Sequence, residues 1–245
     1  MKLSVIMPVY NEQGTIREIV ARVLAVDLPN LERELVVVDD GSTDGTRAFL
    51  AEMDGRDGVR VLLQPKNLGK GAAVARGFRE ASGDILIVQD SDLEYDPSEF
   101  GIVLRPILAG EADVVYGSRF LGTPSGHRVL YFWHSVGNRM LTLLSNIFSG
   151  LNLTDMETCY KAMTRDIAAR LDLRSRRFGV EPEITIKVAR LGARVYEVPI
   201  SYHGRTYEEG KKIGLKDAFQ AALTLLRFTG WRAPKGGRPG ADRKR

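Results

Sequence analysis

The chain has 245 residues, of which 44% are hydrophobic and 27% are charged, close to the average for globular proteins. This composition excludes disordered, collagen-like and low-complexity proteins, and the length suffices for one large domain or two small ones. The single cysteine, Cys159, forms neither an internal disulfide nor a cysteine-based zinc site by itself. We therefore expect a folded, cytoplasmic protein.

The net charge of +4 is concentrated at the end of the chain. Residues 232–245 hold six basic residues and one acidic residue, which leaves 29 basic and 30 acidic residues in residues 1–231. A nucleic-acid-binding protein carries its basic residues on the folded part, so we expect no nucleic-acid partner. The Gly/Pro-rich tail is predicted to be disordered, either as a contact for an anionic surface or as a solvated end.

Short apolar runs alternate with helical patterns in the first half of the chain. Because the runs are apolar almost throughout, they predict strands buried on both faces of a sheet. Helix starts are indicated at Thr15 and at Asp96, which precedes Pro97. This alternation predicts an α/β fold with a mostly parallel sheet and helices on both faces. The predicted strands are residues 3–9, 34–39, 59–63, 84–89 and 112–117.

The pattern changes after Arg119. A long amphipathic helix is predicted over residues 129–148, and no charge-free stretch reaches the ~20 apolar residues of a membrane span. No signal peptide is apparent at the start of the chain, and no linker before residue 232. We expect one domain over residues 1–231, followed by the basic tail 232–245. The later predicted elements are a strand near 159–163, a helix over 182–191, a strand over 194–200 and a helix over 215–228.

Acidic side chains follow three of the predicted strands. Ligands of open parallel sheets bind at the carboxyl ends of the strands, where these loops meet. The glycine motifs of dinucleotide-binding and P-loop proteins do not occur at the corresponding places. The acidic residues are Glu12 after the first strand, Asp39 and Asp40 at the second, and Asp90, Asp92 and Glu94 after the fourth.

The last three carboxylates predict a metal site. Asp90, Asp92 and Glu94 repel one another unless a cation neutralises them, and hard oxygen ligands favour Mg²⁺ or Mn²⁺. The alternative is a set of ordinary surface acids on a loop. Asp39 and Asp40 are common turn residues, or contacts for a ribose or a base.

The chain contains, in order, the segments SVIMPVYNE, VVVDDGSTDGT, NLGKGAAVARGF and QDSDLEYDP. Together they resemble the nucleotide-sugar domain of family 2 glycosyltransferases, which have the GT-A fold. The segments DVVYGSRF, TDMETCYKAM and EVPISYHGRTYEEGKKI follow. They resemble the polyprenyl-phosphate hexosyltransferases of the dolichol-phosphate mannose synthase type, and the likeness extends roughly over residues 3–228.

The resemblance implies a role for each matching position. Asp90 would face the donor, and Asp92 with Glu94 would hold Mg²⁺ or Mn²⁺ on its diphosphate. Arg119 would lie where the donor and acceptor phosphates meet. Arg205 and Lys211 would complete the site from a late loop. The residues that would hold the nucleotide are Pro8, Tyr10, Glu12, Asp39, Asp40 and Lys70.

The implied reaction is an inverting transfer of a hexose from GDP-mannose or UDP-glucose to a dolichyl or undecaprenyl phosphate. A lipid phosphate, with a second pKa of about 6, is largely a dianion at neutral pH and needs no general base. A hydroxyl acceptor on a saccharide or glycolipid would need one, and Asp155 is a candidate, or else it orients an arginine. The cationic residues after the acidic loop favour the phosphate. A silent nucleotide-sugar-binding protein is the remaining alternative.

A lipid acceptor implies peripheral contact with the cytosolic face of a membrane. The predicted helix over residues 215–228 carries an apolar stripe, which includes Leu223, Leu226 and Phe228, directly before the basic tail. Such a stripe is typical of an interfacial anchor and equally of a helix packed on its own domain. The charged segment 205–214 is interpreted as a lid over the donor or as a solvated loop.

Overall fold

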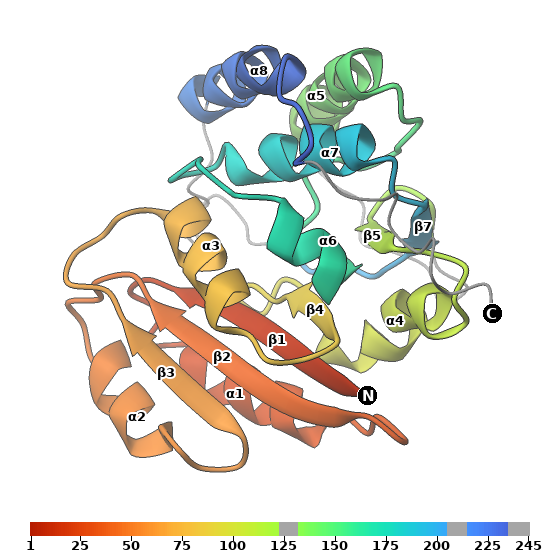
Figure 1. The fold of residues 1–245 in the computed structure, drawn as a ribbon. Helices are drawn as coiled ribbons and strands as arrows, with labels where there is room; N and C mark the ends of the chain where they lie inside the picture. The colour runs from red at the N-terminus through yellow and green to blue at the C-terminus, as the bar shows by residue number, and fades with distance from the viewer. Residues whose placement is uncertain (123–131, 205–214, 235–245) are drawn as a thin grey trace.

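A computed structural model of the chain describes residues 1–122, 132–204 and 215–234, with His134 and residues 215–219 described by backbone alone. Its strands are β1 (Lys2–Val9), β2 (Glu32–Asp39), β3 (Val59–Leu63), β4 (Ile85–Val88), β5 (Val114–Ser118), β6 (Lys161–Thr164) and β7 (Val195–Pro199). They form one sheet in the order β3-β2-β1-β4-β6-β5-β7 (Figure 1). Neighbouring strands are parallel, except that β6 runs antiparallel to both β4 and β5.

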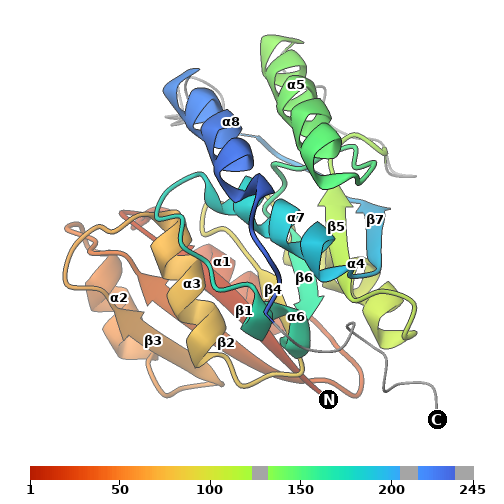
Figure 2. The ribbon, with the colours of Figure 1, turned by 45° about the horizontal axis from the view of Figure 1, so that its top comes forward.

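Helices cover both faces of this sheet. The described helices are α1 (Ile16–Ala25), α2 (Thr46–Met53), α3 (Lys70–Glu80), the 3-10 turn η1 (Pro97–Glu99), α4 (Phe100–Leu108), α5 (Phe132–Ser149), α6 (Arg165–Arg170), α7 (Val180–Leu191) and α8 (Leu215–Thr229). Helix α3 lies in front of β1 and β2, whereas α1 lies behind them (Figures 1 and 2). The prediction of a mostly parallel sheet between two helical layers is therefore confirmed.

The apolar runs form the core because, as predicted, they are strands buried on both faces of the sheet. All four residues of β4 are buried, as are the last seven of β1, because helices cover both faces of these central strands. The core continues through β2, β5 and β6 as one cluster of buried side chains. A half-exposed strand alternates between apolar and polar residues. A strand buried on both faces does not, so its sequence is a continuous apolar run.

Both predicted helix starts are present, but only one of them has a side-chain capping bond. The Asp96 carboxylate accepts a hydrogen bond from the Ser98 backbone N–H at 2.9 Å, so the predicted cap is present, although it begins η1 and not α4 directly. The predicted start at Thr15 is also present, since Thr15 is the N-cap residue of α1, but its hydroxyl makes no capping bond to the helix. It donates instead to the Ser91 carbonyl oxygen at 2.8 Å, which ties the loop after β1 to the loop after β4.

Helices α5, α7 and α8 form a separate layer beside the sheet (Figure 2). Ile186 on α7 packs against Leu225 and Phe228 on α8, in a second apolar cluster. Lys187, fully buried on α7, forms an ion pair with Glu183 at 2.5 Å and lies over the Phe228 ring. Within the described ranges, no helix is both long and apolar enough to traverse a bilayer.

Candidate functional site

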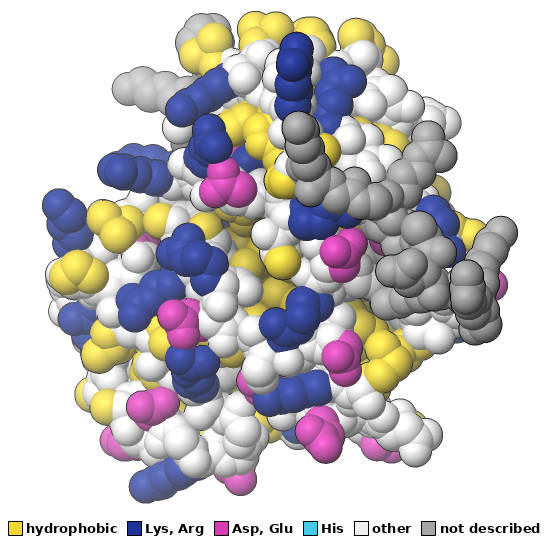
Figure 3. Space-filling model, in the orientation of Figure 1, with side chains coloured by type: hydrophobic (Ala, Val, Ile, Leu, Met, Phe, Trp, Pro, Cys, Tyr) yellow, Lys and Arg dark blue, Asp and Glu magenta, His cyan; other side chains and the backbone are white. Residues whose placement is uncertain are grey.

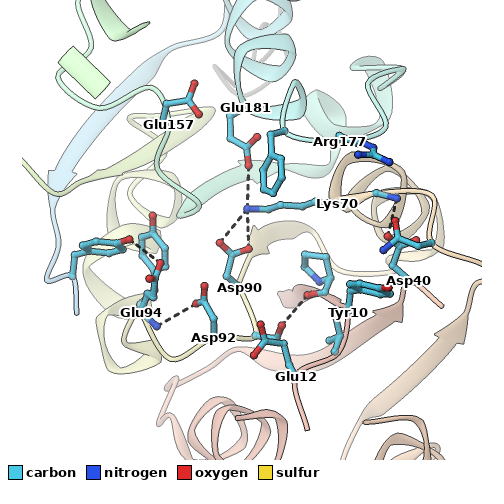
Figure 4. A pocket seen from close by; sticks show the side chains of 18 of the residues that line it. Tyr10, Glu12, Asp40, Lys70, Asp90, Asp92, Glu94, Glu157, Arg177 and Glu181 are labelled. Atoms are coloured by element: carbon cyan, nitrogen blue, oxygen red, sulfur yellow. Dashed lines mark hydrogen bonds and ion pairs between the residues drawn. The ribbon is translucent and has the colours of Figure 1, made fainter. Parts of the chain in front are cut away.

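A cavity of about 640 Å³ opens where the strand order reverses. Strands β1 and β4 are neighbours, but the chain leaves β1 toward β2 on one side and β4 continues the sheet on the other. Their carboxyl ends therefore form the crevice in which ligands of open α/β sheets bind. The sequence-predicted residues among its lining are Pro8, Tyr10, Glu12, Asp40, Lys70, Asp90, Asp92, Glu94 and Arg119 (Figure 4).

The structure separates the two adjacent aspartates at the end of β2. Asp39 is fully buried, accepts hydrogen bonds from the backbone N–H groups of Gly41 and Ser42, and pairs with Arg47 at 2.6 Å. It does not belong to the cavity lining. Its partners make it a support of the turn that follows β2, so its predicted contact with the nucleoside does not fit this position.

Asp40, in contrast, lines the cavity and holds the loop before α3. Its carboxylate accepts hydrogen bonds from Gln64 Nε2 and from the backbone N–H groups of Leu68 and Gly69, each at 2.7 Å. Burial raises the pKa of Asp40 despite these hydrogen bonds, and the adjacent Asp39 adds to the rise. The carboxylate fixes the backbone from which Lys70 extends.

Two glycines at the start of α3 bring a distant segment to the site. A Cβ atom on Gly69 would lie 2.2 Å from the Arg176 carbonyl oxygen, and one on Gly71 would lie 2.2 Å from that of Ser175. Only glycine permits this approach, and Gly69 also adopts a φ of +99°. The segment thereby places Arg177 and Phe178 in the cavity lining.

Lys70 joins two carboxylates across the cavity. Its Nζ atom lies 2.9 Å from Asp90 Oδ1 and 3.1 Å from Glu181 Oε1 (Figure 4). Burial opposes the charge of the ammonium group, but Asp90 and Glu181 outweigh it and hold the pKa of Lys70 well above its ordinary value. Lys70 is therefore held as a cation, and its charge is shared between Asp90 and Glu181.

The acidic loop after β4 makes a strained turn between Asp92 and Glu94. Leu93 has a φ of +64°, a left-handed conformation that is costly for a residue with a Cβ, and its side chain packs against the core. Asp92 Oδ1 accepts a hydrogen bond from the Glu94 backbone N–H at 3.2 Å. The Glu94 carboxylate in turn accepts one from the Tyr202 hydroxyl at 2.7 Å, which orients the carboxylate.

These carboxylates fit a divalent ion that is held jointly with a ligand. Among the described residues, no three His, Cys, Asp or Glu side chains are arranged to hold a metal by themselves. Mg²⁺ at nucleotide sites is commonly held by one or two carboxylates together with substrate phosphates, so a cage of protein ligands is not required. Asp92 and Glu94, both in the cavity lining, supply that number.

Arg119 follows β5 and lines the cavity, and its guanidinium group is bound to the Asp155 carboxylate. Its Nε atom lies 2.6 Å from Asp155 Oδ2 and its second terminal nitrogen 2.7 Å from Asp155 Oδ1, while Asn138 on α5 donates to the same carboxylate. Burial opposes both charges, yet their mutual attraction raises the pKa of Arg119 and lowers that of Asp155. Asp155 is fully buried and outside the cavity lining, so it orients the arginine and is not placed to act as a base.

Two predicted site residues, Arg205 and Lys211, lie outside the described residues, as does the predicted lid 205–214. Conversely, several lining residues were missed by the sequence analysis. Tyr202 sits within a segment that the resemblance included, three residues before Arg205, and could have been found there. Asn67, in the loop after the predicted strand 59–63, and Glu157 also lie in segments that the resemblance included, whereas Arg177, Phe178 and Glu181 lie in none of them. The lining residues to which the sequence gave no role are Val9, Asn67, Gly69, Ser91, Tyr95, Glu157, Arg177, Phe178, Glu181 and Tyr202.

The family model of glycosyl transferase family 2 matches residues 4–172, and the chain belongs to that family. A dolichol-phosphate mannosyltransferase of Pyrococcus furiosus is 31% identical over 94% of this chain and 64% of its own length. An undecaprenyl-phosphate mannosyltransferase of Micrococcus luteus is 33% identical over 87% of this chain and 88% of its own length. The chain thus spans less than two thirds of the Pyrococcus relative.

The fold also matches solved structures of glucosyl-3-phosphoglycerate synthase from Mycobacterium tuberculosis. The complex with Mn²⁺, UDP and glucosyl-3-phosphoglycerate has a TM-score of 0.71 and 25% identity, covering 94% of this chain and 80% of that one. The complex with Mg²⁺ and UDP has a TM-score of 0.68 and 25% identity, with coverage of 94% and 79%. The predicted GT-A fold is confirmed.

Proposed function

We propose that this chain transfers a hexose from a nucleotide sugar to a polyprenyl phosphate, with inversion at the anomeric carbon. The observation that carries the proposal is the meeting of the acidic loop, Asp90 to Glu94, with Arg119 in one cavity at the strand ends. The two mannosyltransferase relatives, whose names specify dolichol phosphate and undecaprenyl phosphate, support this acceptor class.

Different walls of the cavity suit different parts of the nucleotide sugar. Tyr10 and Asp40 lie together on the wall away from Glu94 and suit the nucleoside, since one offers a ring face and the other a hydrogen-bond acceptor (Figure 4). Asp92 and Glu94 would hold Mg²⁺ or Mn²⁺ on the diphosphate, and two solved neighbours contain one of these ions with UDP. When bound, the ion stabilises the charge that develops on the leaving nucleotide.

Arg119 suits the acceptor phosphate. Asp155 occupies its Nε atom and one terminal nitrogen, which fixes the guanidinium plane and leaves the remaining nitrogen for an anion. A phosphate dianion attacks the hexose without transferring a proton, so the reaction needs no base at this point. This agrees with the burial of Asp155, and it places the hydroxyl-acceptor alternative second.

We also propose that α5 and α8 bring the chain to the cytosolic face of a membrane. Helix α8 packs through Leu225 and Phe228, yet Leu223 and Leu226 on its other side are about half exposed. Hydrophobic side chains gather at this end of the molecule, with Lys and Arg side chains close by (Figure 3). The exposed large hydrophobic residues on α5 are Phe132, Trp133, Met140, Leu143 and Ile147.

The transfer assay tests the proposal directly. The purified chain is incubated with radiolabelled GDP-mannose, UDP-glucose or UDP-galactose and a short-chain polyprenyl phosphate, and the lipid is extracted and counted. We expect a labelled lipid from one donor. Label that appears only in an added saccharide would favour the hydroxyl acceptor, and the absence of turnover with every donor and acceptor would favour a silent binder.

The metal is tested in the same assay. EDTA should abolish the transfer, and excess Mg²⁺ or Mn²⁺ should restore it. Asp92→Asn should remove most turnover, because a neutral amide does not replace the charge of a carboxylate on the ion. Exchange of the exposed Glu111 for Gln serves as the control, since that residue lies outside the cavity lining. Transfer at the wild-type rate in EDTA would refute the metal role.

A further inference from the structure

One ion pair on α7 is buried outside the cavity and has no role in the site described so far. Glu183 and Lys187 lie one helical turn apart, with their charged groups 2.5 Å from each other and both side chains fully buried. Neither residue belongs to the cavity lining. A buried ion pair adds little net stability compared with apolar side chains of the same volume, because both charges lose their hydration. The groups that the pair binds besides each other therefore indicate what it does.

The pair binds three backbone groups of the chain between α6 and α7. The Glu183 carboxylate accepts hydrogen bonds from the backbone N–H groups of Arg174, at 2.8 Å, and Ser175, at 2.6 Å, one on each oxygen. The Lys187 Nζ atom donates to the Asp172 carbonyl oxygen at 2.6 Å. Asp172 has a φ of +41°, a left-handed conformation that is unfavourable for a residue with a Cβ. Charge-assisted hydrogen bonds are stronger than neutral ones, so the pair holds this segment in one conformation.

The same segment continues into a wall of the cavity. Its contact with the start of α3 includes a hydrogen bond from the Ala72 backbone N–H to the Arg176 carbonyl oxygen, at 3.1 Å. The next two residues, Arg177 and Phe178, line the cavity. Arg177 lies on the same side of the cavity as Asp40, the side that suits the nucleoside (Figure 4). A change in the conformation of residues 172–176 would therefore move two side chains of the nucleotide-binding wall.

The end of α8 contacts both the ion pair and this segment. The Lys187 Nζ atom lies 4.8 Å from the centre of the Phe228 ring and 5.2 Å from that of the Trp231 ring. A cation over an aromatic ring is attracted to it, most strongly where water is excluded. A Cβ atom on Gly179 would lie 2.7 Å from Thr224 Oγ1, so α8 also closely approaches the chain directly after the cavity wall. One ammonium group thus links α8, which packs on α7 (Figure 2), to the backbone of the segment.

We propose that Glu183 and Lys187 are positioning residues, which couple the packing of α8 on α7 to the conformation of residues 172–178 and so to the affinity of the cavity for a nucleotide. This inference rests on the proposed function, because it takes the cavity to bind a nucleotide sugar. It adds that Phe228 and Trp231, which do not line the cavity, act on nucleotide binding through Lys187. Because α8 is also the helix proposed to meet the membrane, contact with lipid has a route to the nucleotide.

Calorimetric titration of the full chain with GDP and UDP in Mg²⁺ measures this coupling, and the nucleotide that the wild type binds is then used for every variant. Trp231→Leu removes one ring from Lys187 and should weaken nucleotide binding by about threefold or more. Trp231→Phe keeps a ring over the ammonium group and should stay within about twofold of the wild type. Lys187→Met should lose more affinity than Trp231→Leu, because the Asp172 carbonyl oxygen and the Glu183 carboxylate lose their donor.

Hydrogen exchange provides a readout in the segment itself. The backbone N–H groups of Arg174 and Ser175, which Glu183 binds, should exchange faster in Trp231→Leu and Lys187→Met than in the wild type. Val23→Ala is the matched control, since Val23 is fully buried on α1, behind the sheet (Figure 1). It should lower the melting temperature and change neither the nucleotide affinity nor this exchange.

The outcomes distinguish this inference from the proposed function. The positioning role would be overturned if Val23→Ala weakened nucleotide binding as much as Trp231→Leu, or if Trp231→Leu changed the melting temperature alone. If Lys187→Met does not fold, the two Trp231 variants decide the question. Wild-type transfer to lipid together with normal nucleotide binding by Trp231→Leu would overturn this inference alone. The expected loss in Trp231→Leu without any hexose transfer by the wild type would refute the proposed function alone, and a wild type that binds neither nucleotide would refute both.

Discussion

Arg119 shows how a residue at the site can also support the fold. Because its guanidinium neutralises the fully buried Asp155, its removal leaves an unpaired charge in the interior. The resemblance alone assigned Arg119 to the donor and acceptor phosphates. The ion pair instead predicts losses of both activity and stability.

A pair of variants separates these two losses. Arg119→Met should lower the free energy of unfolding by about 3–5 kcal/mol, as expected when one partner of a buried ion pair is removed. Arg119→Met with Asp155→Asn should recover part of that loss, because the amide still accepts from Asn138 without a charge. Urea denaturation measures the stabilities. Recovery of transfer activity in the double variant would contradict the assignment of Arg119 to the acceptor phosphate.

Glu157 predicts a pH dependence of stability. Below a pH of about 4.5 its carboxyl is protonated in both the folded and the unfolded chain, and between about 4.5 and 8 only the folded chain keeps the proton. Stability from this residue therefore falls as the pH rises through that window and is constant above it. Glu157→Gln lacks the effect, so its advantage in melting temperature over the wild type should grow from about pH 5 to about pH 8. A constant difference across this range would show that the Glu157 pKa is not raised.

At the scale of elements, α5 carries more exposed large hydrophobic side chains than any other helix among the described residues. Trp133 is 78% exposed and Leu143 is 61% exposed, on a helix whose other side packs against α7 and α8. Burial of these side chains in the interface of a bilayer would remove their apolar area from water.

Trp133→Glu and Leu143→Glu should each weaken flotation with anionic liposomes, since a charge placed in the interface opposes insertion. The control is Ile102→Glu on α4, which is 44% exposed. Helix α4 packs against β5 and β7, below the layer of α5, α7 and α8 (Figure 1). If all variants floated with the liposomes to the same extent as the wild type, a membrane role for α5 would be contradicted.

For the whole molecule, the charge is divided between the domain and the tail. Residues 232–245 carry a net charge of +5, and most of this segment lies outside the described residues. Each basic residue near an anionic surface contributes about 1 kcal/mol, an attraction that salt screens.

A chain that ends at Trp231 should therefore float less readily than the full chain at low salt and show a flatter salt dependence. The comparison uses the same anionic vesicles at low and high salt, with neutral vesicles as the control. Identical flotation of the two chains would leave the tail as a solvated end.

The sequence by itself determined the α/β class and the acidic loops that face the cavity. Apolar runs report burial on both faces, and loops after parallel strands meet at one edge whatever their separation along the chain. This is why Glu12, Asp40 and Asp92 could be assigned to one site without coordinates.

Only the tertiary structure decided which partner each side chain has. Asp39 and Asp40 are adjacent and alike in sequence, yet one pairs with Arg47 in the interior and the other lines the cavity. Neither Glu157 nor Glu181 directly follows one of the parallel strands whose ends form the site. They line the cavity because the chain passes through the antiparallel strand β6 and then returns to the site at the start of α7. The pattern of apolar residues along the sequence predicts whether each residue is buried. Hydrogen-bond partners and pKa values depend instead on residues that are far apart in the chain.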